Sequence, residues 1–224
     1  MEASYLRVSK KSFTLITLVV VLFLGAVAIG IFRVFFVRMV RVPTGAMMNT
    51  ILPGDRVVVN KLLGRIDRGD IVVFQYPGNN EYYVARVIGL PGELIQLRGK
   101  LVFINGRVLD EQRVMVAPMK NEYDPLKELS TAGTGPYRVY YTQHTLGDDE
   151  GSTDDSGDFG VVTPFQIPAD SYFILGDNRD NSYDSRYRGA APGNLIWGKP
   201  SIIYYSTTRP NDEVRTDRIF KRVQ

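Results

Sequence analysis

The sequence predicts a mainly β protein: an N-terminal transmembrane helix, then an antiparallel β domain with a small β insert. Two observations lead to this prediction. An apolar run without charge extends from Phe13 to Phe32. After residue 40 the chain holds short β-branched and aromatic runs, separated by Pro-Gly and Asn-Gly turns, and no long helical periodicity. We therefore expect barrel-like or sandwiched sheets outside the membrane.

The apolar run predicts a transmembrane helix over residues 12–34, preceded by a polar tail of residues 1–11 that the resemblance described below places in the cytoplasm. About 20 residues that rise about 1.5 Å each match a hydrocarbon core about 30 Å thick. A cleaved secretory signal is disfavoured, because the run exceeds the usual apolar region of about 7–15 residues. Basic residues flank both ends, so charge alone gives only a weak indication of orientation.

The β domain is predicted to be interrupted by an insert. Strand-like runs place the core in residues 35–106 and 161–224, and Asn105-Gly106 is a type I′ hairpin signal. Residues 107–160 hold one clear strand, 137–141, and an acidic Gly/Ser-rich tract, 147–158. We interpret the tract as a solvated loop, because the spacing of a calcium-binding loop is missing. The remaining strand-like runs are 34–37, 39–42, 56–61, 70–76, 82–90, 94–97, 100–104, 172–175 and 202–206.

The composition excludes several classes of function. In 224 residues there is no cysteine, so disulfides and thiol nucleophiles are excluded. The net charge of +3 is too small to indicate a nucleic-acid partner. A single histidine, His144, cannot form a multi-histidine metal site, and we interpret it as solvated or structural. We expect neither a metal nor a cofactor.

Two stretches carry the chemistry-bearing residues. Residues 43–55, Pro-Thr-Gly-Ala-Met-Met-Asn-Thr-Ile-Leu-Pro-Gly-Asp, crowd small residues and two methionines between the anchor and the first core strand. Alone, this is either an irregular strand or a binding or catalytic loop. Residues 176–186 hold three Asp, two Asn, two Ser and two Arg directly after a strand-like run. Such density predicts a rigid polar network, with a well-capped structural turn as the alternative.

Four blocks together resemble the type I signal peptidases, the membrane-bound Ser-Lys proteases that remove secretory signal peptides. They are residues 43–55, the strand 54–61, the segment 86–93 and the run Gly-Asp-Asn-Arg-Asp-Asn-Ser-x-Asp-Ser-Arg at 176–186. The blocks occur in the family's order, behind the expected anchor. The resemblance implies a single-pass protein of the bacterial cytoplasmic membrane with its N-terminus inside. It also implies a monomer that contacts lipids and signal peptides with Ala-x-Ala cleavage sites.

The resemblance also implies residue roles. Acyl transfer would use a serine whose base is a lysine, with position 46 for the nucleophile and position 85 for the base. Ser182 matches the hydroxyl that orients the lysine, and Thr44 with the backbone N–H of residue 46 matches the oxyanion hole. The expected structural network is Asp177, Asp184 and Arg186. The expected substrate-binding residues are Val42, Pro43, Met47, Ile51, Tyr83 and Val84.

The chain departs from the family at the two catalytic positions. Ala46 stands where the family has Ser, and Ala85 where it has Lys. Alanine has no nucleophile and no proton acceptor, so we predict that the chain as written is catalytically dead. Engineered inactivation is favoured over a natural pseudo-protease, because the supporting residues are intact. Asn49 also departs from the family, in which Pro is frequent at this position, and we expect this difference to have little effect.

Other classes stay open. A membrane-tethered β adaptor could bind extended peptides without cleaving them. A related Ser-Lys peptidase, from pilin maturation or a self-cleaving repressor, is a second alternative. The long apolar run and the lack of a DNA-binding helix pattern count against a repressor.

Overall fold

The structure is a computed structural model that describes residues 10–61, 64–76, 81–119, 121, 124–142, 157–161, 163–208 and 211–224. It divides into two compact units, Met1–Arg38 and Met39–Gln224. His144 and the acidic tract up to residue 156 lie outside the described residues, so the structure does not test their interpretation.

The N-terminal unit holds one helix, α1 (Lys10–Phe36). Residues 34–36 were expected to be extended, and the structure corrects this by continuing the helix to Phe36. Elongation adds one hydrogen bond per residue, and no Pro or Gly occurs in residues 31–36 to end it. A search of the described residues finds no helix with the length and apolar character that a membrane span requires. The transmembrane anchor therefore stays a prediction.

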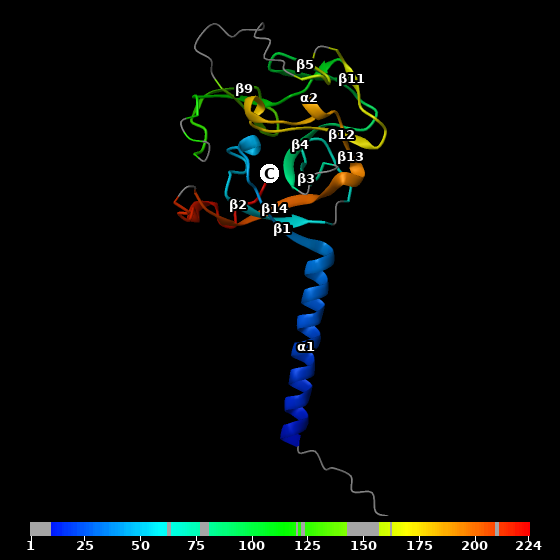
Figure 1. The fold of residues 1–224 in the computed structure, drawn as a ribbon, viewed down its shortest axis with the longest axis vertical. Coiled ribbons are helices and arrows are strands. Elements are labelled where there is room, and N and C mark those ends of the chain that lie inside the picture. Colours follow the sequence, from blue (N-terminus) through cyan, green and yellow to red (C-terminus); the bar gives the residue numbers. More distant parts are fainter. Residues whose placement is uncertain are drawn as a thin grey trace, which may run out of the picture. The chain divides into compact units, whose positions relative to one another are not determined.

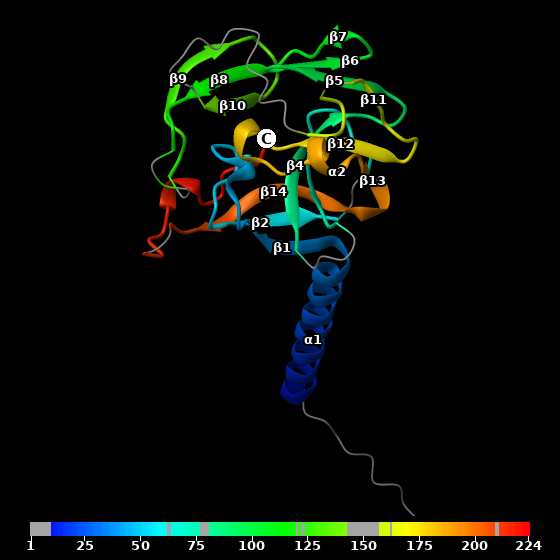
Figure 2. The same cartoon turned by 45° about the horizontal axis from the view of Figure 1, so that its top comes forward.

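The larger unit is built on a seven-stranded sheet with the order β1-β2-β14-β3-β4-β12-β13 (Figures 1 and 2). The long strand β14 pairs antiparallel with β2 along most of its length and with β3 near its N-terminal end. It thereby joins the two halves of the sheet. The strands are β1 (Val37–Arg41), β2 (Asp55–Asn60), β3 (Ile71–Phe74), β4 (Tyr83–Gly89), β12 (Ser171–Leu175), β13 (Ala191–Pro192) and β14 (Ile196–Ser206).

A second sheet, of order β11-β5-β6-β7, lies on the side of this unit away from β2 and β14 (Figures 1 and 2). Its hairpin turn has positive φ at Asn105 and Gly106, as a type I′ turn requires, which confirms that prediction. The strands are β5 (Leu94–Arg98), β6 (Leu101–Ile104), β7 (Arg107–Val108) and β11 (Phe165–Gln166).

The insert forms a third sheet, here called the insert sheet: β8 (Gln112–Val116), β9 (Glu128–Ala132) and β10 (Arg138–Thr142), in the order β10-β8-β9. Of these strands the sequence predicted only β10. All five residues of β9 are exposed, so no apolar alternation marks it. The β8–β10 pair is parallel, whereas the pairs β2–β14, β3–β14, β3–β4, β4–β12, β12–β13, β5–β11, β5–β6, β6–β7 and β8–β9 are antiparallel. The mainly antiparallel β class is confirmed.

Short helices complete the described fold. They are η1 (Gly45–Met47), η2 (Arg179–Asn181), α2 (Ser185–Arg188), η3 (Gly193–Leu195) and η4 (Thr216–Arg218).

A buried carboxylate fastens the start of β2 to the C-terminal end of the chain. Asp55 is fully buried and accepts hydrogen bonds from the Leu52 N–H at 2.8 Å and the Ser206 hydroxyl at 2.6 Å. It also accepts one from the Arg218 guanidinium at 2.7 Å. Arg218 is itself buried. Because Asp55 ends the loop of residues 43–54, this ion pair holds that loop at its base.

We predict that Asp55→Asn lowers the free energy of unfolding by about 3–5 kcal/mol, because it leaves the buried Arg218 charge without a counter-charge. Urea unfolding of the full chain in detergent measures the change. The matched control is Asp67→Asn, which breaks an ion pair whose side chains are 84% (Arg65) and 56% (Asp67) exposed. It should change the free energy by about 0.5 kcal/mol or less. Equal losses in the two variants would contradict the prediction.

Candidate active site

The first segment of the site is a closed loop that carries Ala46. At its base the Val42 N–H donates to the Asp55 carbonyl at 2.9 Å, and the Gly54 N–H donates to the Val42 carbonyl at 3.0 Å. Within it, η1 presents a half-buried Ala46, while Thr44 is exposed and makes no side-chain capping bond to η1. The adjacent methionines are both buried, Met47 and Met48 in different apolar clusters. The two methionines therefore anchor the loop on two sides.

The second segment, residues 176–186, folds as a compact polar turn. Asp184 caps α2 by accepting from the Arg186 N–H, and its carboxylate pairs with the Arg186 guanidinium at 2.9 Å. The same carboxylate accepts from the Gly176 N–H at 3.0 Å. Burial alone would lower the pKa of Arg186, and the Asp184 charge beside it raises that pKa above its ordinary value.

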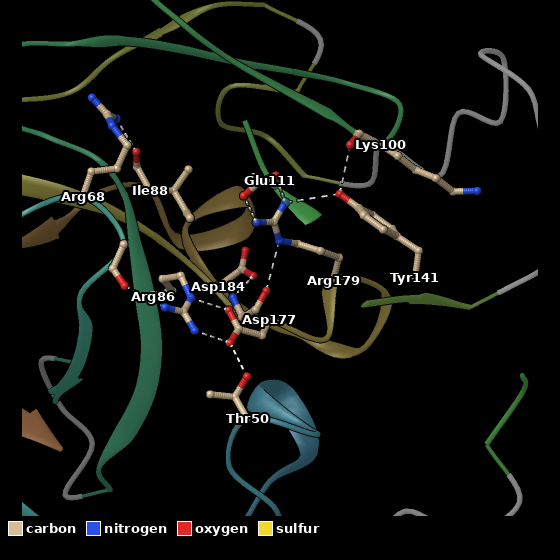
Figure 3. A network of polar contacts seen from close by, with 12 residues as sticks. Thr50, Arg68, Arg86, Ile88, Lys100, Glu111, Tyr141, Asp177, Arg179 and Asp184 are labelled. Atoms are coloured by element: carbon tan, nitrogen blue, oxygen red, sulfur yellow. Dashed lines mark hydrogen bonds and ion pairs between the residues drawn. The ribbon is translucent and has the colours of Figure 1, made fainter. Parts of the chain in front are cut away.

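The two segments are joined by direct hydrogen bonds. The Asn178 N–H donates to the Ala46 carbonyl at 2.9 Å, and the Asn178 side-chain amide donates to the Gly45 carbonyl at 3.1 Å. From the other direction, the Thr50 hydroxyl donates to the Asp177 carboxylate at 2.6 Å (Figure 3). These bonds make the loop of Ala46 and the polar turn one structural unit.

Gly176 marks the point at which the predicted catalytic positions converge. A β carbon on Gly176 would lie 2.6 Å from the Ala46 carbonyl oxygen and closer still to the Ser182 hydroxyl. Both residues therefore contact the bare glycine backbone. In the sheet, Leu175, the residue before Gly176, pairs with Arg86, the residue after Ala85, in antiparallel register. Positions 46 and 182 therefore both contact Gly176, and position 85 adjoins the sheet pairing that ends directly before Gly176.

Ala85 lies in an apolar environment. It is 3% exposed and belongs to a buried cluster with Phe74, Tyr76, Val87 and Ile174, among others. Its neighbour Val84 lies on the opposite face of β4, as strand alternation requires, and belongs to a different cluster. A side chain at position 85 therefore extends into surroundings that disfavour a charge.

Arg86 ties β4 to the polar turn. Its guanidinium donates twice to the Asp177 carboxylate, each time at 2.8 Å, and once to the Gly69 carbonyl at 2.7 Å (Figure 3). Both members of the ion pair are at most 3% exposed. Burial alone would lower the pKa of Arg86, but the Asp177 charge raises that pKa, so the guanidinium stays charged. The residue after position 85 is therefore held rigidly.

The residues expected to bind substrate fall into two groups. Val42, Met47, Ile51 and Val84 come together in one buried cluster. Tyr83 lies on the other face of β4, where its ring stacks on Phe74 at 5.8 Å between centroids. Pro43 is exposed beside Val42. The sequence interpretation named these residues as one set, and the structure brings four of the six together.

The sequence did not predict a further buried ion pair, which joins Glu111 of the insert to Arg179 of the polar turn (Figure 3). Each side chain is 1% exposed. Burial alone would lower the pKa of Arg179, but the Glu111 charge holds it well above its ordinary value. No pattern marks Glu111, since a single glutamate in a polar stretch usually faces solvent.

Comparison with known proteins identifies the family of the chain. A family model described as "Signal peptidase, peptidase S26" matches residues 15–205. Signal peptidase I of Leptolyngbya laminosa is 31% identical over 193 residues, which cover 81% of this chain and 75% of that protein. Signal peptidase I of Rickettsia typhi is 34% identical over 204 residues, which cover 79% of this chain and 75% of that protein. The chain therefore belongs to the signal peptidase family, peptidase S26.

Proposed function

We propose that this chain is a form of a membrane-anchored serine endopeptidase that removes signal peptides from secreted preproteins with a Ser-Lys dyad. As written, with Ala46 and Ala85, it binds signal peptides and does not cleave them. One observation supports this most directly: position 46 and Ser182 both contact Gly176, and position 85 adjoins the β4–β12 pairing that ends directly before Gly176. Family membership supports the substrate class.

The proposed chemistry needs a neutral lysine at position 85. The buried apolar cluster around Ala85 would penalise an ammonium there and so lower the pKa of the lysine. Ser182, across Gly176, would orient the amine. The lysine could then take the proton of a serine hydroxyl at position 46.

The remaining steps use groups of the loop that carries Ala46. The serine oxygen would attack the scissile carbonyl, and the lysine would return its proton to the leaving amine. The developing oxyanion would be held by the Thr44 hydroxyl and the backbone N–H of residue 46. Water, deprotonated by the same lysine, would then hydrolyse the acyl-enzyme. Asp177, Asp184 and Arg186 would hold the framework without touching the substrate.

The peptide would bind as an added strand between residues 42–43 and 82–84. The pairing of β4 with β12 ends at Arg86, so residues 83–85 of β4 extend beyond the end of β12. The cluster of Val42, Met47, Ile51 and Val84 lies next to this stretch and leaves little room, which favours small side chains. Alanine at the first and third positions before the cut fits such pockets.

The proposed location is the bacterial cytoplasmic membrane, with the apolar run predicted at residues 12–34 as a single-pass anchor, a cytoplasmic N-terminus and the β domain outside. Membrane lipids are then partners, and the protein acts as a monomer. A second candidate function is a natural pseudo-protease that only binds peptides. The loss of both dyad side chains makes this function possible for the chain as written. The residues at positions 46 and 85 in the native gene discriminate between the two.

We predict that Ala46→Ser together with Ala85→Lys, here called the restored-dyad variant, cleaves a preprotein with an Ala-x-Ala site. Each single substitution should stay inactive, because nucleophile and base are both required. Cleavage in detergent is followed by gel electrophoresis and N-terminal sequencing. The chain as written should bind the same signal peptide without cutting it. Absence of cleavage by the restored-dyad variant would refute the dyad.

We predict that Gly176→Ala in the restored-dyad variant lowers kcat by about 100-fold or more, because the added methyl group forces position 46 and Ser182 apart. Steady-state cleavage of a fluorogenic signal peptide measures it. Gly25→Ala is the control, since a β carbon there meets no atom within 4 Å. A Gly176→Ala variant with unchanged kcat would show that the close approach has no catalytic importance.

A further inference from the structure

The insert sheet packs against the loop that carries Ala46. Met48 and Leu52 of that loop are at most 1% exposed and form one buried cluster with residues of the insert. The insert members of the cluster are Val114, Val116, Leu126 and Tyr140. The insert therefore covers the side of the loop that lies away from the cluster of Met47.

Asn49 adds a polar link on the same side. Its side-chain amide donates to the Leu126 carbonyl at 3.1 Å and accepts from the Leu126 N–H at 2.8 Å. Its φ is +69°, a conformation that Asn tolerates and Pro cannot adopt. A proline at this position could not make these contacts, and the expectation that the departure has little effect stays a prediction. The asparagine both turns the loop and ties it to the insert.

The insert also contacts the polar turn through the backbone of β10. The Tyr140 N–H donates to the Asp177 carbonyl at 2.7 Å, and Tyr140 forms a parallel bridge with Asn178. The Thr142 N–H donates to the Asp180 carboxylate at 2.6 Å. One short strand thus runs beside the residues that follow Gly176.

The Glu111–Arg179 ion pair reaches Gly176 itself. Glu111 holds the Arg179 guanidinium through two nitrogens, one of them 3.1 Å from a carboxylate oxygen. The third guanidinium nitrogen of Arg179 donates to the Gly176 carbonyl at 3.2 Å. Because Asp184 accepts from the Gly176 N–H, polar groups on both sides of Gly176 are fixed by side chains. Figure 3 shows the Arg179 guanidinium extending from the polar turn to Glu111.

We propose that the insert sheet is a brace that positions the active site, and that Glu111, the residue directly before β8, is the main positioning residue of the insert. Glu111 fixes Arg179, Arg179 fixes the Gly176 carbonyl, and Gly176 sets the spacing between position 46 and Ser182. Asn49 holds the other segment against the same sheet. The catalytic part of this inference rests on the proposed function, whereas the structural coupling does not.

The kinetic test is Glu111→Gln in the restored-dyad variant. We expect kcat to fall by about tenfold or more with KM within about twofold, because the substitution disturbs the reacting geometry and leaves the peptide site intact. The control is Glu128→Gln, which alters an ion pair of the same insert whose side chains are 37% (Glu128) and 48% (Arg138) exposed. It should leave both constants unchanged. A folded Glu111→Gln variant with unchanged kcat overturns the proposal.

A double variant separates positioning from stability. Glu111→Met with Arg179→Met replaces the buried ion pair with apolar side chains and leaves no unpaired charge, so it should fold even where Glu111→Gln does not. It still removes the donor to the Gly176 carbonyl. We therefore expect the same loss of kcat. Full kcat in this variant shows that the ion pair serves stability alone and overturns the proposal.

Amide hydrogen exchange in the chain as written tests the coupling without any catalysis. Glu111→Gln should speed exchange of the Gly176 and Asn178 amides by about tenfold, while amides of β2 stay unchanged. Asn49→Gly should likewise speed exchange of the Asn178 amide. The control is Asn105→Gly, because Asn105 also has a positive φ and accepts a hydrogen bond from the Leu94 N–H; it should leave that exchange unchanged. Unchanged exchange at Gly176 and Asn178 overturns the brace. If the restored-dyad variant itself cleaves nothing, the proposed function fails and the exchange result still decides the coupling.

Discussion

The close approach at Gly176 is the constraint on which the site depends. The Ala46 carbonyl oxygen and the Ser182 hydroxyl both lie close to the position that a β carbon on this residue would take, so there is no space for one. Because these contacts are so close, a displacement of the end of β12 would also move Ala46 and Ser182. The hydrogen bonds from Arg179 to the Gly176 carbonyl and from the Gly176 N–H to Asp184 hold it there. Most of the polar run at 176–186 can be understood as support for one glycine.

The buried charges follow the same logic. Desolvation makes a buried ion pair weak support for stability on its own. Three of the buried pairs join segments that are far apart in the sequence: Arg86 with Asp177, Glu111 with Arg179, and Asp55 with Arg218. We infer that they specify which segments meet, since a wrong pairing would leave a charge buried and uncompensated.

The two alanines fit this framework without disturbing it. A lysine at position 85 would have to lose its hydration inside an apolar cluster. This desolvation would make the amine a base, and it would also lower the stability of the fold. Alanine removes that penalty and adds no polar atom. Position 46 keeps its backbone carbonyl bond to Asn178, which does not involve a side chain. In the proposed function, the two alanines remove the reacting groups and leave the hydrogen bonds between the two segments of the site in place.

The sequence by itself determined the β class and the hairpin at Asn105-Gly106, and it indicated the two segments that the structure joins, because these are encoded in contiguous residues and local turn chemistry. Only the tertiary structure decided that Glu111 meets Arg179, that Asn49 bonds to Leu126, and that β9 exists. Glu111 and Arg179 are 68 residues apart, and Asn49 and Leu126 are 77 apart. The five residues of β9 are exposed and carry no periodic signal. Contacts of this kind depend on which surfaces the folded sheets bring together, and a local pattern holds no information about that.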